Sequence, residues 1–216
     1  QMTGLIYKDF LALKGHLTTY LVFFVVYGGL CVAGVVTPPV LCGMVVLVSL
    51  ITPMSTVTAD DISRWNRFAI ATPVCRRGVV AGKYLFTLLM VLLSTVVVAV
   101  LLGLLSLSGG SGEEPLPEML LATLACGGIA LLMNGVTLPL LLKFGAEKAR
   151  LVSMALFLLV FGSVALLGLA MDNGFVLPAL PAWLAAALPG LLAIVSVGGF
   201  ALSYCISQAV YAKKEF

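Results

Sequence analysis

One polar connection carries the residues best suited to recognise another protein. It runs from Asp60 to Tyr84, with the sequence DDISRWNRFAIATPVCRRGVVAGKY, and long apolar runs lie on either side of it. The segment holds five of the twelve basic residues and one of the two tryptophans. Because tryptophan and arginine dominate the energetics of protein interfaces, the chemistry that this segment offers is docking.

The first half of the connection has the pattern of a short amphipathic helix. Ile62, Trp65 and Phe68 recur at helical spacing and define one apolar face. Acidic residues ahead of a helix cap its free N–H groups, and a residue before proline, here Thr72, disfavours the α region and ends the helix. The predicted partner-binding residues are Asp60, Asp61, Ile62, Arg64, Trp65, Arg67, Phe68 and Thr72.

Two interpretations of this helix stay open. Arginines that touch anionic lipid at the membrane surface would explain the basic residues. Docking of a cytoplasmic partner would also explain the length of the connection, since most connections take only about 4–6 residues. The sequence favours docking.

The common catalytic and metal-binding motifs are missing from the sequence. There is no GxxxxGK[ST] phosphate loop and no HExxH motif. The one histidine, His16, can complete neither a metal site nor a Ser–His arrangement inside a membrane. We therefore expect no catalytic residue, no metal site and no cofactor bound by this chain.

Membrane spans are the elements that must hold the polar connection. The chain of 216 residues is 62 % hydrophobic and only 10 % charged, whereas soluble domains carry about 25 % charged residues. Apolar stretches of about 20 residues are long enough to span a bilayer, and the absence of alternation predicts helices rather than barrel strands. We predict one all-α membrane domain, 1–216, with spans near 17–36, 39–58, 84–107, 119–142, 151–171 and 189–208.

The predicted spans contain no Asp, Glu, Lys, Arg or His. The usual proton relay of a carrier is therefore missing, and the energy for any transport would come from a partner. Asn134 and Thr137 lie near a glycine and a proline in the fourth span. They fit either a kinked helix whose amide bonds a neighbouring helix or part of a translocation path.

The charge distribution predicts how the spans are oriented. With six spans, all twelve basic residues fall on one face, which the positive-inside rule makes cytoplasmic, so both termini are predicted to be cytoplasmic. We expect an amphipathic interfacial helix over 1–16, a cytoplasmic segment over 60–83 and an outer interfacial segment over 172–188. The predicted membrane-interface anchors are Lys8, Lys14, Arg76, Arg77, Lys83 and Trp183.

The polar connection resembles the signature of a known family. An acidic start, a Trp, a nearby aromatic, Thr-Pro, Arg-Arg and Gly-Lys-Tyr are similar to the pattern of ABC-2 type permeases. The closer likeness is to small bacterial half-permeases, including the exporters of phenol-soluble modulin peptides, although Thr72 stands where the family usually has Leu. The matching residues are Asp60, Asp61, Trp65, Phe68, Thr72, Pro73, Arg76, Arg77, Lys83 and Tyr84, with Tyr7, Lys8 and Asp9 similar to the family's opening.

The resemblance implies a specific assembly. Two copies would pair, as a homodimer rather than a heterodimer, in the bacterial plasma membrane. Each would dock on a separate ATPase subunit that binds ATP and Mg, with 60–72 as the coupling helix. The cargo would be an amphipathic peptide or a similar amphiphile. The alternative function is an energy-independent facilitator, or a sensor or immunity protein for such peptides.

Overall fold

The computed structural model describes residues 2–63, 76–107, 115–173 and 181–212, and every element in these ranges is a helix. Each helix contains a stretch long and apolar enough to cross a membrane. Even the shortest, with 25 residues, is about 38 Å long at 1.5 Å per residue and exceeds the hydrocarbon core of about 30 Å. The helices are α1 (Met2–Val32), α2 (Pro38–Ile62), α4 (Arg76–Leu107), α5 (Leu116–Phe144), α6 (Ala146–Asp172) and α7 (Ala182–Ala212).

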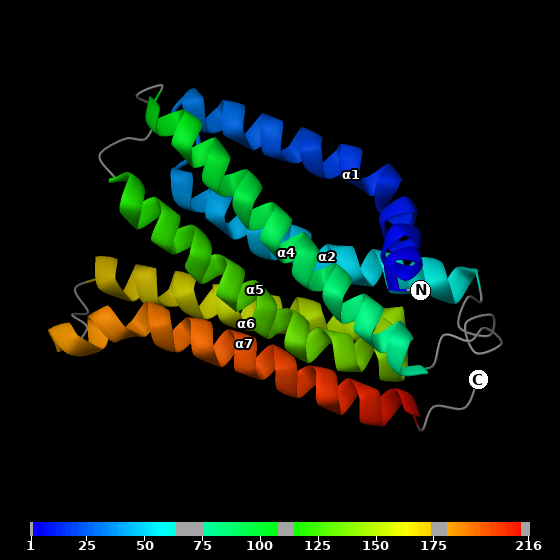
Figure 1. Cartoon of the computed structure of the whole chain (residues 1–216). Coiled ribbons are helices and arrows are strands. Elements are labelled where there is room, and N and C mark those ends of the chain that lie inside the picture. The colour runs from blue at the N-terminus through cyan, green and yellow to red at the C-terminus, as the bar shows by residue number, and fades with distance from the viewer. Residues whose placement is uncertain (1, 64–75, 108–114, 174–180, 213–216) are drawn as a thin grey trace.

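The six helices form one elongated bundle, and the first residues of α1 and the last residues of α7 lie at the same end of it (Figure 1). We call this the basic end, because the lysines and arginines of the described ranges all fall near it in their helices. The prediction of six apolar helices is confirmed. Which end faces the cytoplasm stays a prediction.

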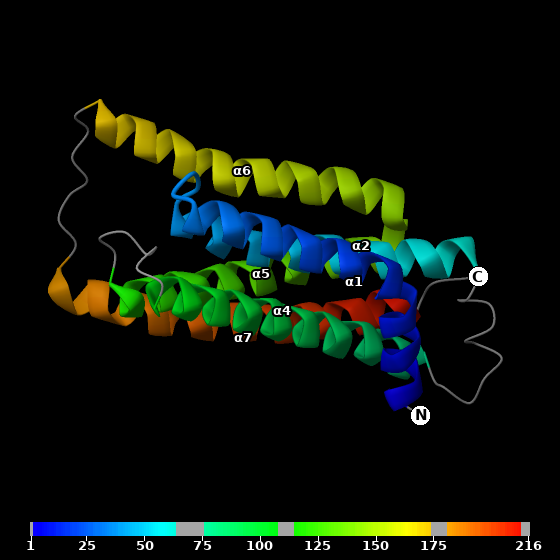
Figure 2. The ribbon, with the colours of Figure 1, turned by 90° about the horizontal axis from the view of Figure 1, so that it is seen from above.

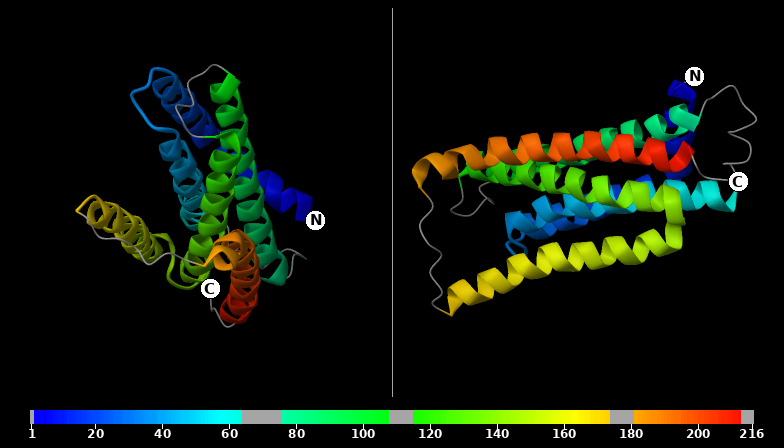
Figure 3. Two further views of the ribbon diagram at one scale, coloured as in Figure 1. Left: turned by 90° about the vertical axis from the view of Figure 1, so that its left-hand side faces the viewer. Right: turned by 90° about the horizontal axis from the view of Figure 1, so that it is seen from below.

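Helix α5 lies at the centre of the bundle and packs against α2, α4, α6 and α7. Small residues allow its closest approach to α7: a Cβ on Gly135 would lie 3.7 Å from the Ser203 Cβ and 3.8 Å from the Gly199 carbonyl oxygen. Such small-residue contacts are the usual means by which membrane helices pack. Helix α6 instead lies to one side of the bundle (Figures 2 and 3) and contacts α5 and α2.

Several boundaries differ from the predicted ones. The expected interfacial helix over 1–16 is continuous with the first span, because α1 runs from Met2 to Val32; its first part turns across the basic end, at a steep angle to the rest (Figure 2), and its place at the membrane surface stays a prediction. Helix α7 likewise includes Pro189, which was expected to start the last span. A proline is tolerated inside a membrane helix where neighbouring groups satisfy the freed carbonyl.

The polar connection is shorter than predicted because the helices on both sides extend into it. Helix α2 ends at Ile62, so Asp60 and Asp61 belong to its last turn and do not cap a new helix. Helix α4 already begins at Arg76. Of the expected helix over 60–72, residues 64–72 lie outside the described residues.

Candidate functional site

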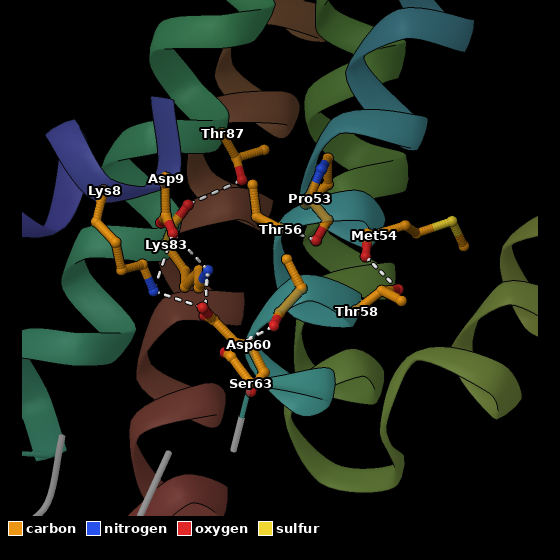
Figure 4. Close-up of polar contacts among 11 residues, drawn as sticks. Lys8, Asp9, Pro53, Met54, Thr56, Thr58, Asp60, Ser63, Lys83 and Thr87 are labelled. Atoms are coloured by element: carbon orange, nitrogen blue, oxygen red, sulfur yellow. Dashed lines mark hydrogen bonds and ion pairs between the residues drawn. The ribbon is translucent and has the colours of Figure 1, made fainter. Parts of the chain in front are cut away.

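A buried group of charges lies at the basic end, where three helices meet (Figure 4). We call Lys8, Asp9, Asp60 and Lys83 the charge cluster. The Asp60 carboxylate accepts a hydrogen bond from Lys8 Nζ at 2.5 Å and forms an ion pair with Lys83 Nζ at 2.6 Å. Asp9 Oδ1 lies 2.9 Å from Lys83 Nζ and 3.2 Å from Lys8 Nζ. Each carboxylate therefore contacts both ammonium groups.

The charge cluster is electrically balanced and largely closed to solvent. The side chains of Asp9, Asp60 and Lys83 are at most 7 % exposed, and that of Lys8 is 26 % exposed. Burial of a charge is costly unless it is paired and hydrogen-bonded. Two positive and two negative groups in mutual contact meet that condition, whereas loss of one leaves its partners buried without compensation.

The helical register of the sequence explains why these residues are buried. Thr52, Thr56 and Asp60 are four residues apart, so they share one face of α2, and all three are buried. Lys83 lies one turn before the buried Thr87 on α4, whose hydroxyl donates to the Lys83 carbonyl at 2.8 Å. The faces that α2 and α4 turn toward each other thus end in opposite charges.

The charge cluster joins both ends of the polar connection to the N-terminal helix. Asp60 lies in the last turn of α2, and Lys83 lies in the second turn of α4. Lys8 and Asp9 come from the part of α1 that crosses the basic end. A displacement of the connection between α2 and α4 would therefore act on three helices at once.

The predicted docking residues that the structure describes differ in their exposure. Asp60 is 5 % exposed, so its carboxylate serves the charge cluster and not an exposed docking surface. Asp61 and Ile62 are exposed, and Ile62 leaves 80 % of its surface open. The remaining predicted docking residues, Arg64, Trp65, Arg67, Phe68 and Thr72, lie outside the described residues.

The predicted membrane-interface anchors also differ in their surroundings. Lys14 and Arg77 are exposed near the basic end, as an anchoring role requires. Lys8 and Lys83 instead have carboxylate partners, and the burial of Lys83 leaves no ammonium surface for lipid headgroups. Arg76 and Trp183 fall in the first turns of α4 and α7, but their side chains lie outside the described part of the structure.

The sequence-based interpretation gave Asp9 no role of its own. The signal was available, because Asp9 lies three residues after Ile6 and four before Leu13 and so shares the apolar face of its helix. A carboxylate on a buried face requires a cation. Lys83 supplies one, but only the packing of α1 against α4 brings the two together.

A second polar group follows directly on α4. The Tyr84 hydroxyl lies 2.6 Å from both the Ser203 and the Ser207 hydroxyls of α7. Ser203 also donates a hydrogen bond to the Gly135 carbonyl of α5. The Tyr84 ring packs against Phe200, with 5.0 Å between ring centroids. This group fixes α4, α5 and α7 together next to the charge cluster.

Asn134 and Thr137 are buried in the core of α5. Thr137 donates to the Met133 carbonyl, and the Asn134 amide nitrogen donates to the Ala130 carbonyl, each at 2.8 Å. The Asn134 Oδ1 atom has no hydrogen-bond donor among the described residues. Both amide and hydroxyl thus bond their own helix, and a role in a translocation path stays a prediction.

The charge cluster offers no metal site. No three His, Cys, Asp or Glu side chains of the described ranges lie close enough together to hold a metal ion. Both of its carboxylates are paired with lysine ammonium groups, so the arrangement can hold helices together and transmit displacement between them.

Comparison with protein families decides the class of the protein. Residues 4–212 match the family described as ABC-2 family transporter protein. The chain belongs to the ABC-2 transporter family. The match covers all six helices and both ends of the polar connection. Searches of curated proteins and of solved structures found no match to the chain. Members of the ABC-2 family are membrane components of transporters whose ATPase is a separate component. This chain is therefore a permease component, and the family implies an ABC ATPase partner.

Proposed function

We propose that the chain is the permease of an ATP-driven exporter in a bacterial plasma membrane, with both termini cytoplasmic. Two copies pair, and each docks on a separate ATPase subunit that binds ATP and Mg. Membership of the ABC-2 family supports the ATPase-driven class. The gathering of the basic residues at one end supports a cytoplasmic basic end.

The observation that carries the proposal is the charge cluster. It ties the last turn of α2 and the second turn of α4 to each other and to α1. These two turns flank the segment 64–75, which contains the aromatic and basic residues suited to docking. A push from the ATPase on that segment would reach all three helices together.

This linkage gives the proposed transport cycle a mechanical basis. Packed interfaces shift between discrete arrangements and do not deform continuously, so a small displacement at one site is amplified at another. Closure of the ATPase pair would move the segment 60–72 of each copy. The charge cluster would transmit that movement to α1, α2 and α4, and the path between the copies would reopen on the other side.

The exposed face of α6 supports pairing of two copies. Large apolar residues such as Leu151, Leu159 and Leu166 are each at least 69 % exposed, and the most apolar stretch of the helix has no buried residue. The helix middles carry no charged side chain, so a passage between copies suits an amphipathic peptide or similar amphiphile better than a strongly charged solute.

Reconstitution with the ATPase in proteoliposomes tests the proposal. Trp65→Ala and Asp61→Ala are expected to weaken stimulation of ATP hydrolysis about tenfold or more, because truncation of a hot-spot residue at an interface removes at least about 2 kcal/mol. Lys148→Gln, an exposed basic residue of α6, is the control and should match the wild type. Equal stimulation by all variants would show that the segment does not dock on the ATPase. Transport that continues with an inactive ATPase would favour a facilitator.

A further inference from the structure

A groove of about 790 Å³ runs between α2 and α6 at the basic end of the bundle. Its walls are mostly apolar, with Ile51 and Met54 from α2 facing Met154 and Phe157 from α6. The α2 wall extends from Leu47 to Ile62, which is about 22 Å at 1.5 Å per residue. The hydrocarbon layer of one leaflet is about 15 Å deep, so the groove is long enough for an acyl chain that spans the leaflet.

The polar lining gathers toward one end of the groove. Arg150 lies about one turn into α6, and His16 approaches from α1. Both side chains are exposed. Arg150 takes part in none of the ion pairs between described residues. Two acidic residues lie near this end without lining the groove: Glu147 is three residues before Arg150 on α6, and the Asp61 carboxylate lies 3.7 Å from a Cβ placed on Gly145.

The position of α6 opens this groove to the bilayer. The helix lies to one side of the main bundle (Figures 2 and 3), and the most apolar stretch of its span has no buried residue. In a membrane the apolar walls would lie at hydrocarbon depth, while Arg150 would lie near the headgroups. A guanidinium there matches a phosphate through two parallel hydrogen bonds.

We propose that this groove binds one anionic glycerophospholipid of the surrounding leaflet, with its phosphate on Arg150 and His16 and an acyl chain between Met54 and Phe157. The charge of the polar end selects this occupant, because basic pockets between membrane helices bind anionic headgroups. A zwitterionic lipid offers its phosphate together with a cation that Arg150 would repel. A basic amphipathic peptide meets the same repulsion.

Photo-crosslinking to the purified full chain in detergent tests the site without the ATPase. The probes are phosphatidylglycerol and phosphatidylcholine that carry the same photoactivatable acyl chain. Wild-type protein should be labelled at least about tenfold more by phosphatidylglycerol, a difference of about 1.4 kcal/mol, at peptides that contain Met54 or Phe157. Arg150→Gln should reduce that preference to about twofold or less.

Two further variants keep the result interpretable. Lys148→Gln removes an exposed positive charge two residues from Arg150 but outside the groove lining, and it should keep the wild-type preference. Ile51→Trp narrows the groove at an exposed lining position and should reduce labelling by both lipids at least about fivefold. Circular dichroism and size exclusion confirm that each variant is folded.

Three results would overturn the proposal. They are equal labelling of the wild type by both lipids, an unchanged preference in Arg150→Gln, and labelling that Ile51→Trp does not reduce. Cross-links between two copies through the groove would also overturn it, since a second chain would then be the occupant. Because the ATPase is absent, none of these results bears on whether the segment 60–72 docks on it.

Discussion

Asp60 and Lys83 face each other across the two ends of the polar connection, with 2.6 Å between the Asp60 Oδ2 and Lys83 Nζ atoms. In its own helix, each is the charged side chain nearest to the apolar stretch. The pair closes the connection into a loop whose ends are held together. Asp9 and Lys8 extend the same contact to α1.

Neutralising Lys83 should destabilise the fold. Lys83→Met keeps most of the side-chain volume but leaves two buried carboxylates with one ammonium group between them. Breaking a buried ion pair in this way costs about 3–5 kcal/mol, to be measured as the free energy of unfolding in detergent mixtures. The exposed Lys148→Gln should stay within about 0.5 kcal/mol of the wild type. Equal stability of both variants would show that the charge cluster contributes nothing to the fold.

Removal of the Tyr84 hydroxyl should loosen α4 from α7. Tyr84→Phe keeps the ring packing on Phe200 but deletes the contacts to Ser203 and Ser207. The expected loss is about 1–3 kcal/mol of unfolding free energy, because buried serine hydroxyls lose a partner. Tyr7→Phe, at a tyrosine that is 66 % exposed, is the control. A loss of similar size in both variants would contradict the role of the hydroxyl.

The close approach of α5 to α7 should not tolerate a larger side chain. In Gly135→Leu, the Cβ atom already reaches contact distance from Ser203 and the backbone of α7, so the outer carbons must displace that helix. Overpacking of this kind costs about 1–3 kcal/mol. Gly162→Leu on α6 is the matched control, since nothing lies within 4 Å of a Cβ there. Thermal unfolding should separate the two variants, and equal midpoints would contradict the packing.

The six helices could be predicted from the sequence because a bilayer permits few alternatives. A run of about 20 apolar residues without charge must satisfy its backbone internally, and only a helix does so within one segment. The ends of the helices were harder to predict. Asp60 and Asp61 were expected outside α2, but a helix continues past the hydrocarbon when its buried face does, and Asp60 continues the face of Thr52 and Thr56.

The charge cluster itself could not be predicted, although three of its four residues carried predicted roles. Charged residues near a membrane boundary fit lipid headgroups, caps or ion pairs equally well until the packing is known. Lys8 and Lys83 lie on different helices, and only the turn of the first part of α1 across the basic end brings them to the same carboxylates (Figure 4). The position of Asp9 was the indication of the charge cluster that the sequence contained, because it places a charge on the apolar face of a helix.

Coupling between ATP hydrolysis and transport tests the central claim most directly. The variant to reconstitute with the ATPase is the double substitution Asp60→Asn with Lys83→Met, which removes one charge of each sign and leaves Lys8 beside Asp9. The exposed and aromatic docking residues are unchanged, so the dissociation constant for the ATPase should stay within about twofold of the wild type. Because the two ends of the connection are no longer held together, cargo transported per ATP hydrolysed should fall at least about tenfold. An unchanged ratio in this variant would show that the charge cluster does not transmit the movement of the ATPase.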